Sequence, residues 1–334
     1  MLVGRNSWQF SSSPTIISSG VVIGKEEAMG NLQKQYDKSY EDMFINEKSF
    51  EAAQQVMMEE AIEFALQKGN ITSDKVNFFL SGDLINQISP TTFAAKTTAI
   101  PYFGLFNACA TSTESLALSA MIMEAKGANY IISGTASHYA ATERQFRFPN
   151  EYGGQIPPTA QRTITGAGTV LIGKQGNGPK ITRATIGKVV DMGVTDPFNM
   201  GGAMAPAAVD TILQHFKDFQ LDATHYDLIL TGDLGTIGRE VTETLLTDNN
   251  IQLKSNQYID CGEFIFKKEQ KMNAGGSGAA CSSVVTYGYF LNELMNSKIK
   301  RLLFVATGAL HSPLSVQQKN SIPCIAHAVA LERV

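Results

Sequence analysis

A cysteine stands in the sequence where a nucleophile could act. Residues 102–106 have the pattern of a strand and residues 111–126 that of a helix, so Cys109 lies in the turn between them. Thr111 and Glu114 have the spacing of a capping box, which favours a helix that begins directly after the cysteine. Because the positive end of a helix dipole lowers the pKa of a nearby thiol, we expect a reactive thiolate here. The alternative is a buried cysteine that only packs, which is what we expect of the other three cysteines.

A glycine-rich segment late in the chain is a candidate anion site. Residues 273–278 read Asn-Ala-Gly-Gly-Ser-Gly and lead into the helical pattern of residues 281–294. Backbone N–H groups at the start of a helix bind carboxylates, so this segment is suited to receive one. Close packing of two backbones near Cys109 explains the same glycines equally well. The earlier glycine-rich stretch at 173–178 precedes a strand-like run instead of a helix, and we do not expect a phosphate loop there.

The elements that must position these residues are repeated along the chain. Residues 71–84 align without a gap on residues 221–234, 150 positions later, and each segment follows a helical pattern and ends in Ser/Thr-Gly-Asp-Leu after a hydrophobic strand. We therefore expect two similar α/β halves, residues 1–178 with Cys109 and residues 179–334. Alternating strands and helices predict mixed, largely parallel sheets with helices outside them.

Two of the five histidines follow strands at equivalent places in the two halves. These are His138 and His311, and because ligands gather at the carboxyl ends of strands in α/β folds, both are candidates for a functional role. Of the other three, His215 is expected to be a surface or edge residue of a helix, and His225 and His327 are expected to be structural. No His, Asp or Glu residues have metal-ligand spacing, so we expect neither a metal nor another cofactor.

Composition and charge exclude several classes of protein. The chain has 334 residues, of which 43% are hydrophobic and 17% charged, so it has the apolar residues for a large core. With 27 Lys and Arg against 31 Asp and Glu, it lacks the basic footprint of a nucleic-acid-binding protein. Four cysteines without a Cys-x-x-Cys pair indicate a reducing compartment. We find neither a signal-peptide pattern nor an apolar run of about 20 residues, so any membrane association is expected to be peripheral.

The segment around Cys109 is similar to that of a known superfamily. Residues 107–112 resemble the nucleophile segment of the thiolase-like superfamily, which includes thiolases and ketoacyl-carrier-protein synthases. Residues 164–171 resemble the Gly-Ala-Gly strand that closes the first half of those enzymes. The resemblance implies a thiolase-like α/β fold with the layers α/β/α/β/α. It also implies a homodimer whose subunits pair through the sheet of the first half.

Further segments resemble one family within that superfamily, the stage V sporulation protein AD family. They are residues 8–10, 147–153, 157–168 and 272–278. The resemblance implies a non-catalytic spore protein that binds dipicolinic acid (pyridine-2,6-dicarboxylate) and acts with membrane proteins of the same operon. It further implies a peripheral place at the inner spore membrane, with dipicolinate uptake during sporulation and release in germination. Whether calcium accompanies the ligand stays open.

The implied ligand constrains the chemistry of its site. Dipicolinate is flat and carries two carboxylates, so its site should combine cationic groups with an apolar slot. Arginines alternate with aromatic residues at 144–148, where a solvated loop is the alternative interpretation, and Arg162 follows. Under the binding hypothesis we expect Arg144, Arg147 or Arg162 to pair with the carboxylates, and which of them do so stays open. Five other residues are expected to line the pocket: Cys109, His138, Asn273, Gly275 and Gly276.

An enzyme is the alternative to a binding protein. Condensing enzymes of the superfamily need His and Asn, or two His, from the second half to activate the thiolate and hold the oxyanion. The corresponding places here, residues 231–234 and 273–278, contain no histidine. That absence favours a binding protein. The nucleophile-type turn favours an acyl-transfer or condensing enzyme that uses Cys109 with His138 or His311.

Overall fold

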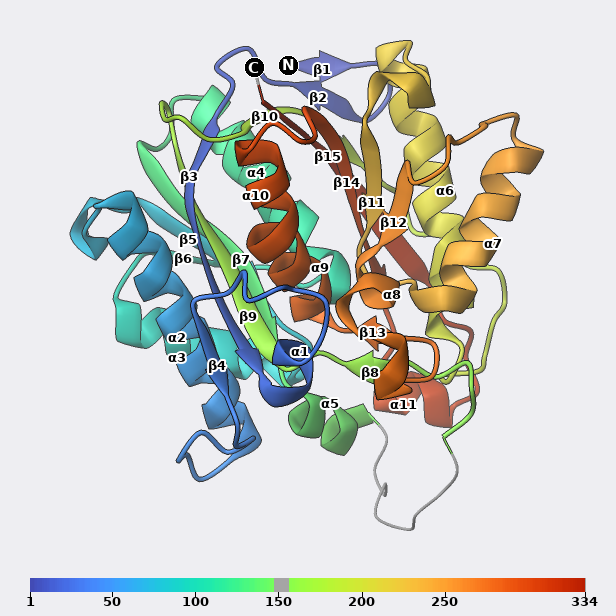
Figure 1. Cartoon of the computed structure of the whole chain (residues 1–334), viewed down its shortest axis with the longest axis horizontal. Coiled ribbons are helices and arrows are strands. Elements are labelled where there is room, and N and C mark those ends of the chain that lie inside the picture. The colour runs from blue at the N-terminus through green and yellow to red at the C-terminus, as the bar shows by residue number, and fades with distance from the viewer. Residues whose placement is uncertain (147–155, 334) are drawn as a thin grey trace.

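One 13-stranded β-sheet forms the framework of the chain, and its long path consists of two five-stranded sections with matching strand orders (Figure 1). Because only one residue pair joins the two sections among the described residues, we call them the first and the second sheet. The structure, a computed structural model, describes residues 1–146 and 156–333. The first sheet has the order β3 (Thr15–Gly24), β9 (Gly166–Gly173), β7 (Tyr130–Ser137), β5 (Phe78–Gly82) and β6 (Tyr102–Gly104). The second has the order β10 (Lys180–Ile186), β15 (Cys324–Glu332), β14 (Arg301–Ala309), β11 (Leu228–Thr231) and β12 (Tyr258–Asp260).

The strands pair in the same way in both sheets. The pairs β3–β9 and β9–β7 are antiparallel, whereas β7–β5 and β5–β6 are parallel. The second sheet repeats this pattern from β10 to β12, and the sheets meet at one residue pair, Thr15 with Lys180. The sheets are mixed, as expected, but with a smaller parallel share than the sequence indicates. Helices cover both faces of β9 and β15, so these antiparallel strands read as continuous buried runs like parallel ones.

Short strands extend this framework. β1 (Leu2–Val3) pairs with β2 (Ser7–Gln9), which lies along β10, and β4 (Lys38–Tyr40) lies along β3. β8 (Arg162–Thr163) and β13 (Gly276–Ser277) form a separate parallel pair. This pair fixes the glycine-rich segment of the second half against the end of the first half.

Helices cover the sheets on the outside and fill the space between them. α2 (Phe50–Gly69) packs on β3 and β9, and α6 (Met200–Phe219) packs on β14 and β15. α4 (Thr111–Glu124) and α9 (Ala279–Val285) lie between the sheets (Figure 1). This confirms the layers α/β/α/β/α. The other helices are α1 (Lys25–Ala28), α3 (Ser89–Thr98), α5 (Tyr139–Phe146), α7 (Gly235–Asp248), α8 (Cys261–Ile265), α10 (Leu291–Met295) and α11 (Pro313–Gln317).

The internal repeat appears in the structure at the expected offset. α2 and α6 have 20 residues each and begin 150 positions apart, and both end at a left-handed residue, Asn70 (φ 51°) and Gln220 (φ 53°). The sequence predicts the second of these helices only from residue 207, because proline rarely lies inside a helix. The helix continues back through Pro206 to Met200. Its first turns are stabilised by packing on α7, where a Cβ on Gly238 would lie 2.4 Å from the carbonyl oxygen of Gly201.

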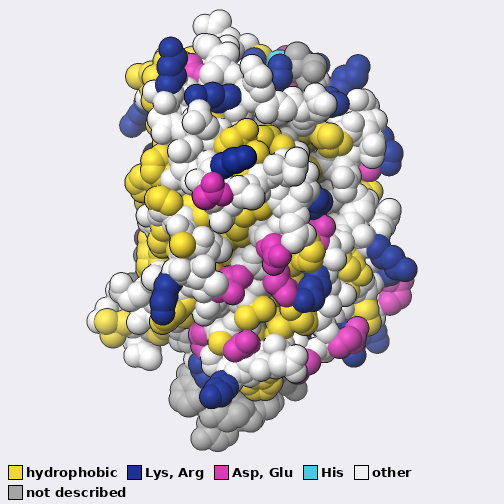
Figure 2. Space-filling view, turned by 90° about the vertical axis from the view of Figure 1, so that its left-hand side faces the viewer, with side chains coloured by type: hydrophobic (Ala, Val, Ile, Leu, Met, Phe, Trp, Pro, Cys, Tyr) yellow, Lys and Arg dark blue, Asp and Glu magenta, His cyan; other side chains and the backbone are white. Residues whose placement is uncertain are grey.

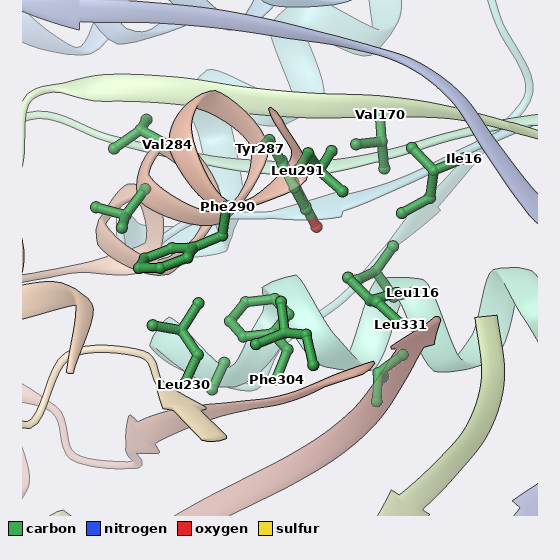
Figure 3. Close-up of a cluster of buried hydrophobic side chains, with 14 of the residues drawn as sticks. Ile16, Leu116, Val170, Leu230, Val284, Tyr287, Phe290, Leu291, Phe304 and Leu331 are labelled. Carbon is green, nitrogen blue, oxygen red and sulfur yellow. The ribbon is translucent and has the colours of Figure 1, made fainter. Parts of the chain in front are cut away.

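A cluster of buried apolar side chains joins the two halves (Figure 3). α4, α9, the π-helical segment Thr286–Phe290 and both sheets contribute to it. Figure 3 labels ten of its members: Ile16, Leu116, Val170, Leu230, Val284, Tyr287, Phe290, Leu291, Phe304 and Leu331. Each large apolar side chain buried here contributes about 1.5–3 kcal/mol of transfer free energy. The cluster therefore fixes the two halves relative to each other, which any site shared between them requires.

Exposed apolar residues gather at the open edge of the first sheet. β6 ends the strand order, and Phe103 (48% exposed) and Phe106 (68%) lie on it or just after it, with Phe93 (52%) on the neighbouring α3. Figure 2 views the molecule from the side of α2, β5 and β6, and hydrophobic side chains gather along one border of that face. No helix in the described part of the chain combines the length and apolar character needed to cross a bilayer.

Candidate functional site

Cys109 lies in one 3-10 turn, Ala108–Ala110, directly before α4. This confirms the predicted position between a strand and a helix. The expected capping box is wrong, because no side chain caps the first residues of α4. Thr111 Oγ1 instead accepts a hydrogen bond from the backbone N–H of Asn107 (3.3 Å), and Glu114 is hydrogen-bonded to the Asn107 side chain. Both side chains thus bind the residue that begins the turn.

Residues of the second half of the chain pack closely against this turn. Ala108 has a φ of 49°, a conformation that residues with a side chain seldom adopt. A Cβ on Gly308 of β14 would lie 2.5 Å from the Asn107 carbonyl oxygen, so only glycine fits there. His327 of β15 accepts a backbone N–H at Nδ1, and its Nε2 lies 3.3 Å from the Asn107 amide. Cys109, two residues after Asn107, is buried and only 8% exposed.

A buried carboxylate lies against the sulfur. Asp233 follows β11 and is 1% exposed. It accepts hydrogen bonds from Thr307 Oγ1 (2.7 Å), Ser277 Oγ (3.0 Å) and the backbone N–H of Gly278 (3.2 Å). The Cys109 thiol donates a further hydrogen bond to this carboxylate. Asp233 thus occupies the position after the second-half strand at which the sequence shows no imidazole.

This arrangement disfavours the thiolate. Burial first, then the negative charge of Asp233 and the thiol's hydrogen bond to it, raise the pKa of Cys109 well above its usual value. A hydrogen bond from the backbone N–H of Gly278 acts in the opposite direction but does not reverse the shift. Burial also raises the pKa of Asp233, against the hydrogen bonds it accepts. The expectation of a thiolate activated by the α4 dipole is therefore wrong, because burial and a neighbouring carboxylate outweigh the helix terminus.

The glycine-rich segment does bind a carboxylate, but the carboxylate belongs to the protein. Ser277 and Gly278 donate to Asp233, at the point where α9 begins. Close backbone packing, the alternative explanation, is present as well, since a Cβ on Gly262 would lie 2.2 Å from the carbonyl oxygen of Gly276. The Gly276 carbonyl also accepts from Gln161 Nε2 (2.8 Å). The segment therefore does both: it binds a carboxylate, and its glycines allow close backbone packing.

The structure does not bring His138 or Arg144 to Cys109. His138 is fully buried, donates from Nε2 to the carbonyl oxygen of Met43 (2.8 Å) and stacks on Phe50 of α2, in the outer layer. Burial lowers its pKa. Ser137, the residue before it on β7, points the other way, as strand alternation requires. Its Oγ accepts a hydrogen bond from the backbone N–H of Ala280 in α9 (3.1 Å). Arg144 is largely exposed and forms an ion pair with Glu51.

Arg162 lies in a small cavity of its own. Its guanidinium stacks 3.9 Å above the ring of Tyr139, and it lines a cavity of about 220 Å³ with Glu27 and Thr165. Burial raises the pKa of Glu27 to about 7, although it accepts a hydrogen bond from the backbone N–H of Thr165. Arg147, the third candidate arginine, lies outside the described residues.

Two predicted ligand residues, Asn273 and Gly275, line a larger groove of about 710 Å³. Asn273 is exposed there instead of lying on a floor beside Cys109. Sequence reasoning missed the cationic residues of this groove, Arg239, Lys267, Lys268 and Lys271. Three of them belong to a charged run that ends just before Asn273, and that adjacency is the signal that could have found them.

The inner wall of the groove is continuous with the surroundings of Cys109. Thr236 and Gly275 line the groove, and the backbone N–H of Thr236 donates to the carbonyl oxygen of Ala274 (2.9 Å). Asp233 lies two residues before α7 and accepts from Ser277 and Gly278 of the same segment. Within the described ranges, no group of three or more His, Cys, Asp or Glu side chains is placed to hold a metal ion.

Solved structures with a similar fold include a 3-oxoacyl-[acyl-carrier-protein] synthase and a 3-ketoacyl-CoA thiolase. The 3-oxoacyl-[acyl-carrier-protein] synthase III from Aquifex aeolicus VF5 superposes with a TM-score of 0.60 at 13% identity, over 96% of this chain and 99% of that one. Human mitochondrial 3-ketoacyl-CoA thiolase, solved in complex with CoA, also gives 0.60, at 11% identity, over 98% and 100% of the two chains. At these identities the likeness shows a thiolase-like fold and nothing about activity.

Comparison of sequences shows the family as well as the fold. The family model described as "Stage V sporulation protein AD (SpoVAD)" matches residues 4–332. The stage V sporulation protein AD of Bacillus subtilis (strain 168) is 45% identical over 332 residues, which are 99% of this chain and 98% of that protein. A whole-length match at this identity, on a thiolase-like fold, leaves one assignment: the chain belongs to the stage V sporulation protein AD family.

Proposed function

We propose that the chain is a non-catalytic protein that binds dipicolinic acid in spores. The observation that carries the non-catalytic part is the Asp233 carboxylate bound to the Cys109 thiol. A condensing enzyme needs a group there that takes the thiol proton and then faces a thiolate. Asp233 does not fill that role, because its carboxylate raises the pKa of the thiol and its protonated form carries no positive charge to stabilise a thiolate. Dipicolinate is proposed as the ligand because the resemblance to the stage V sporulation protein AD family implies it.

The proposal includes the cellular setting of the family. The protein acts with membrane proteins of the same operon in dipicolinate uptake during sporulation and in its release in germination. It lies peripherally at the inner spore membrane and reaches the bilayer through those partners. Residues 1–178 and 179–334 are its two structural halves, and β10, the first long strand of the second, begins at Lys180.

We further propose that two copies of the chain pair through the β6 edge. An edge strand presents unpaired backbone N–H and C=O groups that a second strand can pair with. The exposed Phe93, Phe103 and Phe106 supply apolar area beside that edge. A homodimer formed there extends the first sheet across both copies and leaves the second half free for other partners.

Calorimetric titration with dipicolinate tests the binding function, and acetyl-coenzyme A tests the enzymatic alternative. We expect saturable dipicolinate binding and no mass increase of 42 Da, about that of an acetyl group, after incubation with acetyl-coenzyme A. Cys109→Ala is the control for the acyl-transfer arm. Absence of dipicolinate binding, together with acylation of the protein that the Cys109→Ala variant lacks, would overturn the proposal in favour of an enzyme.

A further inference from the structure

Residues 1–9 lie across the second half of the chain, although the strand that follows them, β3, belongs to the first. They contain β1 and β2, and β2 pairs with β10 over three residue pairs. Figure 1 shows both short strands beside β10 at one end of the molecule. We infer that residues 1–9 form a strap that opens as a unit, and that the carboxylate of Asp218 on α6 is the latch that holds it closed. This inference does not depend on the proposed function.

One end of the strap is fixed to the body of the molecule. Phe10 is buried in the central cluster, and its backbone N–H donates to the carbonyl oxygen of Thr182 (2.9 Å). The backbone N–H groups of Ser11 and Ser12 donate to Glu124, the last residue of α4 (3.2 and 2.8 Å). Residues 10–12 therefore stay in place when the strap opens, and they are its hinge.

The other end of the strap is held by one carboxylate. Asp218 accepts hydrogen bonds from the backbone N–H groups of Arg5 (3.2 Å) and Asn6 (3.4 Å) and from Ser7 Oγ (2.7 Å). Gly4 has a φ of 59°, and a Cβ there would lie 2.1 Å from Asp218 Oδ1, so only glycine allows this approach. Burial acts to raise the pKa of Asp218, but the hydrogen bonds it accepts, chiefly from the strap, lower it overall. The latch is thus charged at neutral pH, the form that accepts hydrogen bonds most strongly.

A buried chain of hydrogen bonds leads from the latch into the second half. Ser7 Oγ lies 2.8 Å from Thr185 Oγ1, which lies 2.8 Å from His215 Nδ1. His215 Nε2 in turn lies 2.7 Å from the hydroxyl oxygen of Tyr226. All four residues are buried. His215 is therefore part of the interior, and the expectation that it lies at the surface or edge of its helix is wrong.

The direction of each hydrogen bond in this chain can be assigned. A carboxylate only accepts, so the hydroxyl hydrogen of Ser7 goes to Asp218, and Ser7 accepts from Thr185. Thr185 must then accept from the Nδ1–H of His215. Burial is the main cause that lowers the pKa of His215 to about 3, so the ring is neutral and Nε2 accepts from Tyr226. The whole chain ends on Asp218 and loses its final acceptor when that carboxylate is removed.

The strap has little buried surface of its own. Met1 and Leu2 are exposed, and of residues 1–9 only Ser7 is buried. Segments with few buried apolar contacts open at a lower free energy than the core of a protein. When the strap is open, the backbone N–H and C=O groups that β10 shares with β2, at residues 183–185, become an unpaired strand edge. The latch therefore controls whether one edge of the second sheet is covered.

Hydrogen exchange of the backbone amides tests the latch. Asp218→Asn removes the charge, and Asp210→Asn is the matched control, because Asp210 lies on the same helix but is paired with Lys188. In Asp218→Asn we expect the amides of residues 5–9 to exchange at least about tenfold faster than in the wild type. The amides of β9 should exchange at the wild-type rate in both variants, which also shows that the variants are folded.

A second variant interrupts the chain on the side of the strap. Ser7→Ala removes one donor to the latch and the link to Thr185, and we expect it to speed exchange of residues 5–9 as well. If these residues exchange at the wild-type rate in both Asp218→Asn and Ser7→Ala, Asp218 is not the latch and the inference fails.

Trp8, the single tryptophan of the chain, lies in β2 and reports on the strap by its fluorescence. In urea, the change in its emission should come at a lower concentration than the loss of helical circular dichroism. The gap between the two transitions should be wider in Asp218→Asn than in the wild type. Coincident transitions in both proteins, with residues 5–9 exchanging only together with β9, would show that the strap does not open as a unit and would refute the inference.

Discussion

The thiol of Cys109 donates a hydrogen bond to the carboxylate of Asp233. That carboxylate also accepts from Thr307, Ser277 and Gly278. It cannot turn away from the sulfur without leaving buried donors unpaired, which costs about 1–3 kcal/mol for each. The pair is thus a fixed feature of the fold, and it keeps the sulfur in its protonated form.

Replacing this carboxylate should release the thiol. In Asp233→Asn the negative charge is lost while an oxygen remains for the neighbouring donors. We expect the pKa of Cys109 to fall and its alkylation by iodoacetamide at pH 8 to become faster, on the order of tenfold. Intact-protein mass spectrometry over time measures the rate, and digestion locates the modified cysteine.

Asp83→Asn is the matched control for that variant. Asp83 is likewise a buried carboxylate, but it binds Thr91 and the backbone N–H of Ile85, in the loop that leads to α3. Its replacement should leave the alkylation rate of Cys109 unchanged. If both variants react at the wild-type rate, Asp233 does not control the sulfur.

The repeat could be predicted from the sequence because it depends on local patterns, whereas the layers were implied by the resemblance to the thiolase-like superfamily. The helices at 50–69 and 200–219 and the strands after them recur at a constant offset, and each pattern is set by residues close in the chain. The turn at Cys109 was predictable for the same reason. The chemistry of Cys109 could not be predicted, since the pKa of its thiol depends on a carboxylate from the other half and on burial between two sheets.

The groove shows the same limit at a larger scale. Its walls come from residue 31, residues 236–239, residues 258–269 and residues 271–275, which no single sequence window contains. The lysine run beside Asn273 was visible in the sequence. That it lines one groove with Arg239 and several aromatic rings depends on the fold. Arg144 illustrates the converse, because it lies in a suggestive Arg-aromatic pattern and is paired with Glu51.

Stability should depend on the protonation of Glu27. Its pKa is raised from about 4.5 to about 7, so the stabilising protonated form is fully present below pH 4.5 and is lost as the pH rises through 7. Glu27→Gln mimics the protonated acid and lacks this loss. Relative to wild type, the variant should therefore gain up to about 3 kcal/mol between pH 5 and pH 8. Urea unfolding at both pH values measures the difference.

An exposed glutamate provides the comparison for Glu27. Glu47→Gln removes a carboxylate that is open to solvent, and its unfolding is measured at the same two pH values. A Glu27→Gln variant that behaves like Glu47→Gln would show that the buried carboxyl is not protonated in the folded state.

His327 should give a pH dependence of the opposite sign. Burial lowers its pKa to about 4, so its contribution is present above pH 6.5 and is lost as the pH falls through 4. His327→Gln loses contacts to Gly187 or Asn107 and should be less stable by about 1–3 kcal/mol at pH 7. Because glutamine does not titrate, this deficit should shrink as the pH is lowered to 4.5. A deficit that stays constant over this range would mean that the histidine is not held neutral.

The edge of the first sheet should decide the oligomeric state. The chain has a mass of 36.2 kDa, so light scattering after gel filtration should give about twice that mass for the wild type. Phe103→Glu/Phe106→Glu places two charges beside β6, where pairing with a second copy would bury them without partners. We expect this variant to be a monomer. Leu314→Glu changes an equally exposed apolar residue on α11 and should remain a dimer. A monomeric wild type, or a Phe103→Glu/Phe106→Glu variant that is still dimeric, would exclude the β6 edge as the interface.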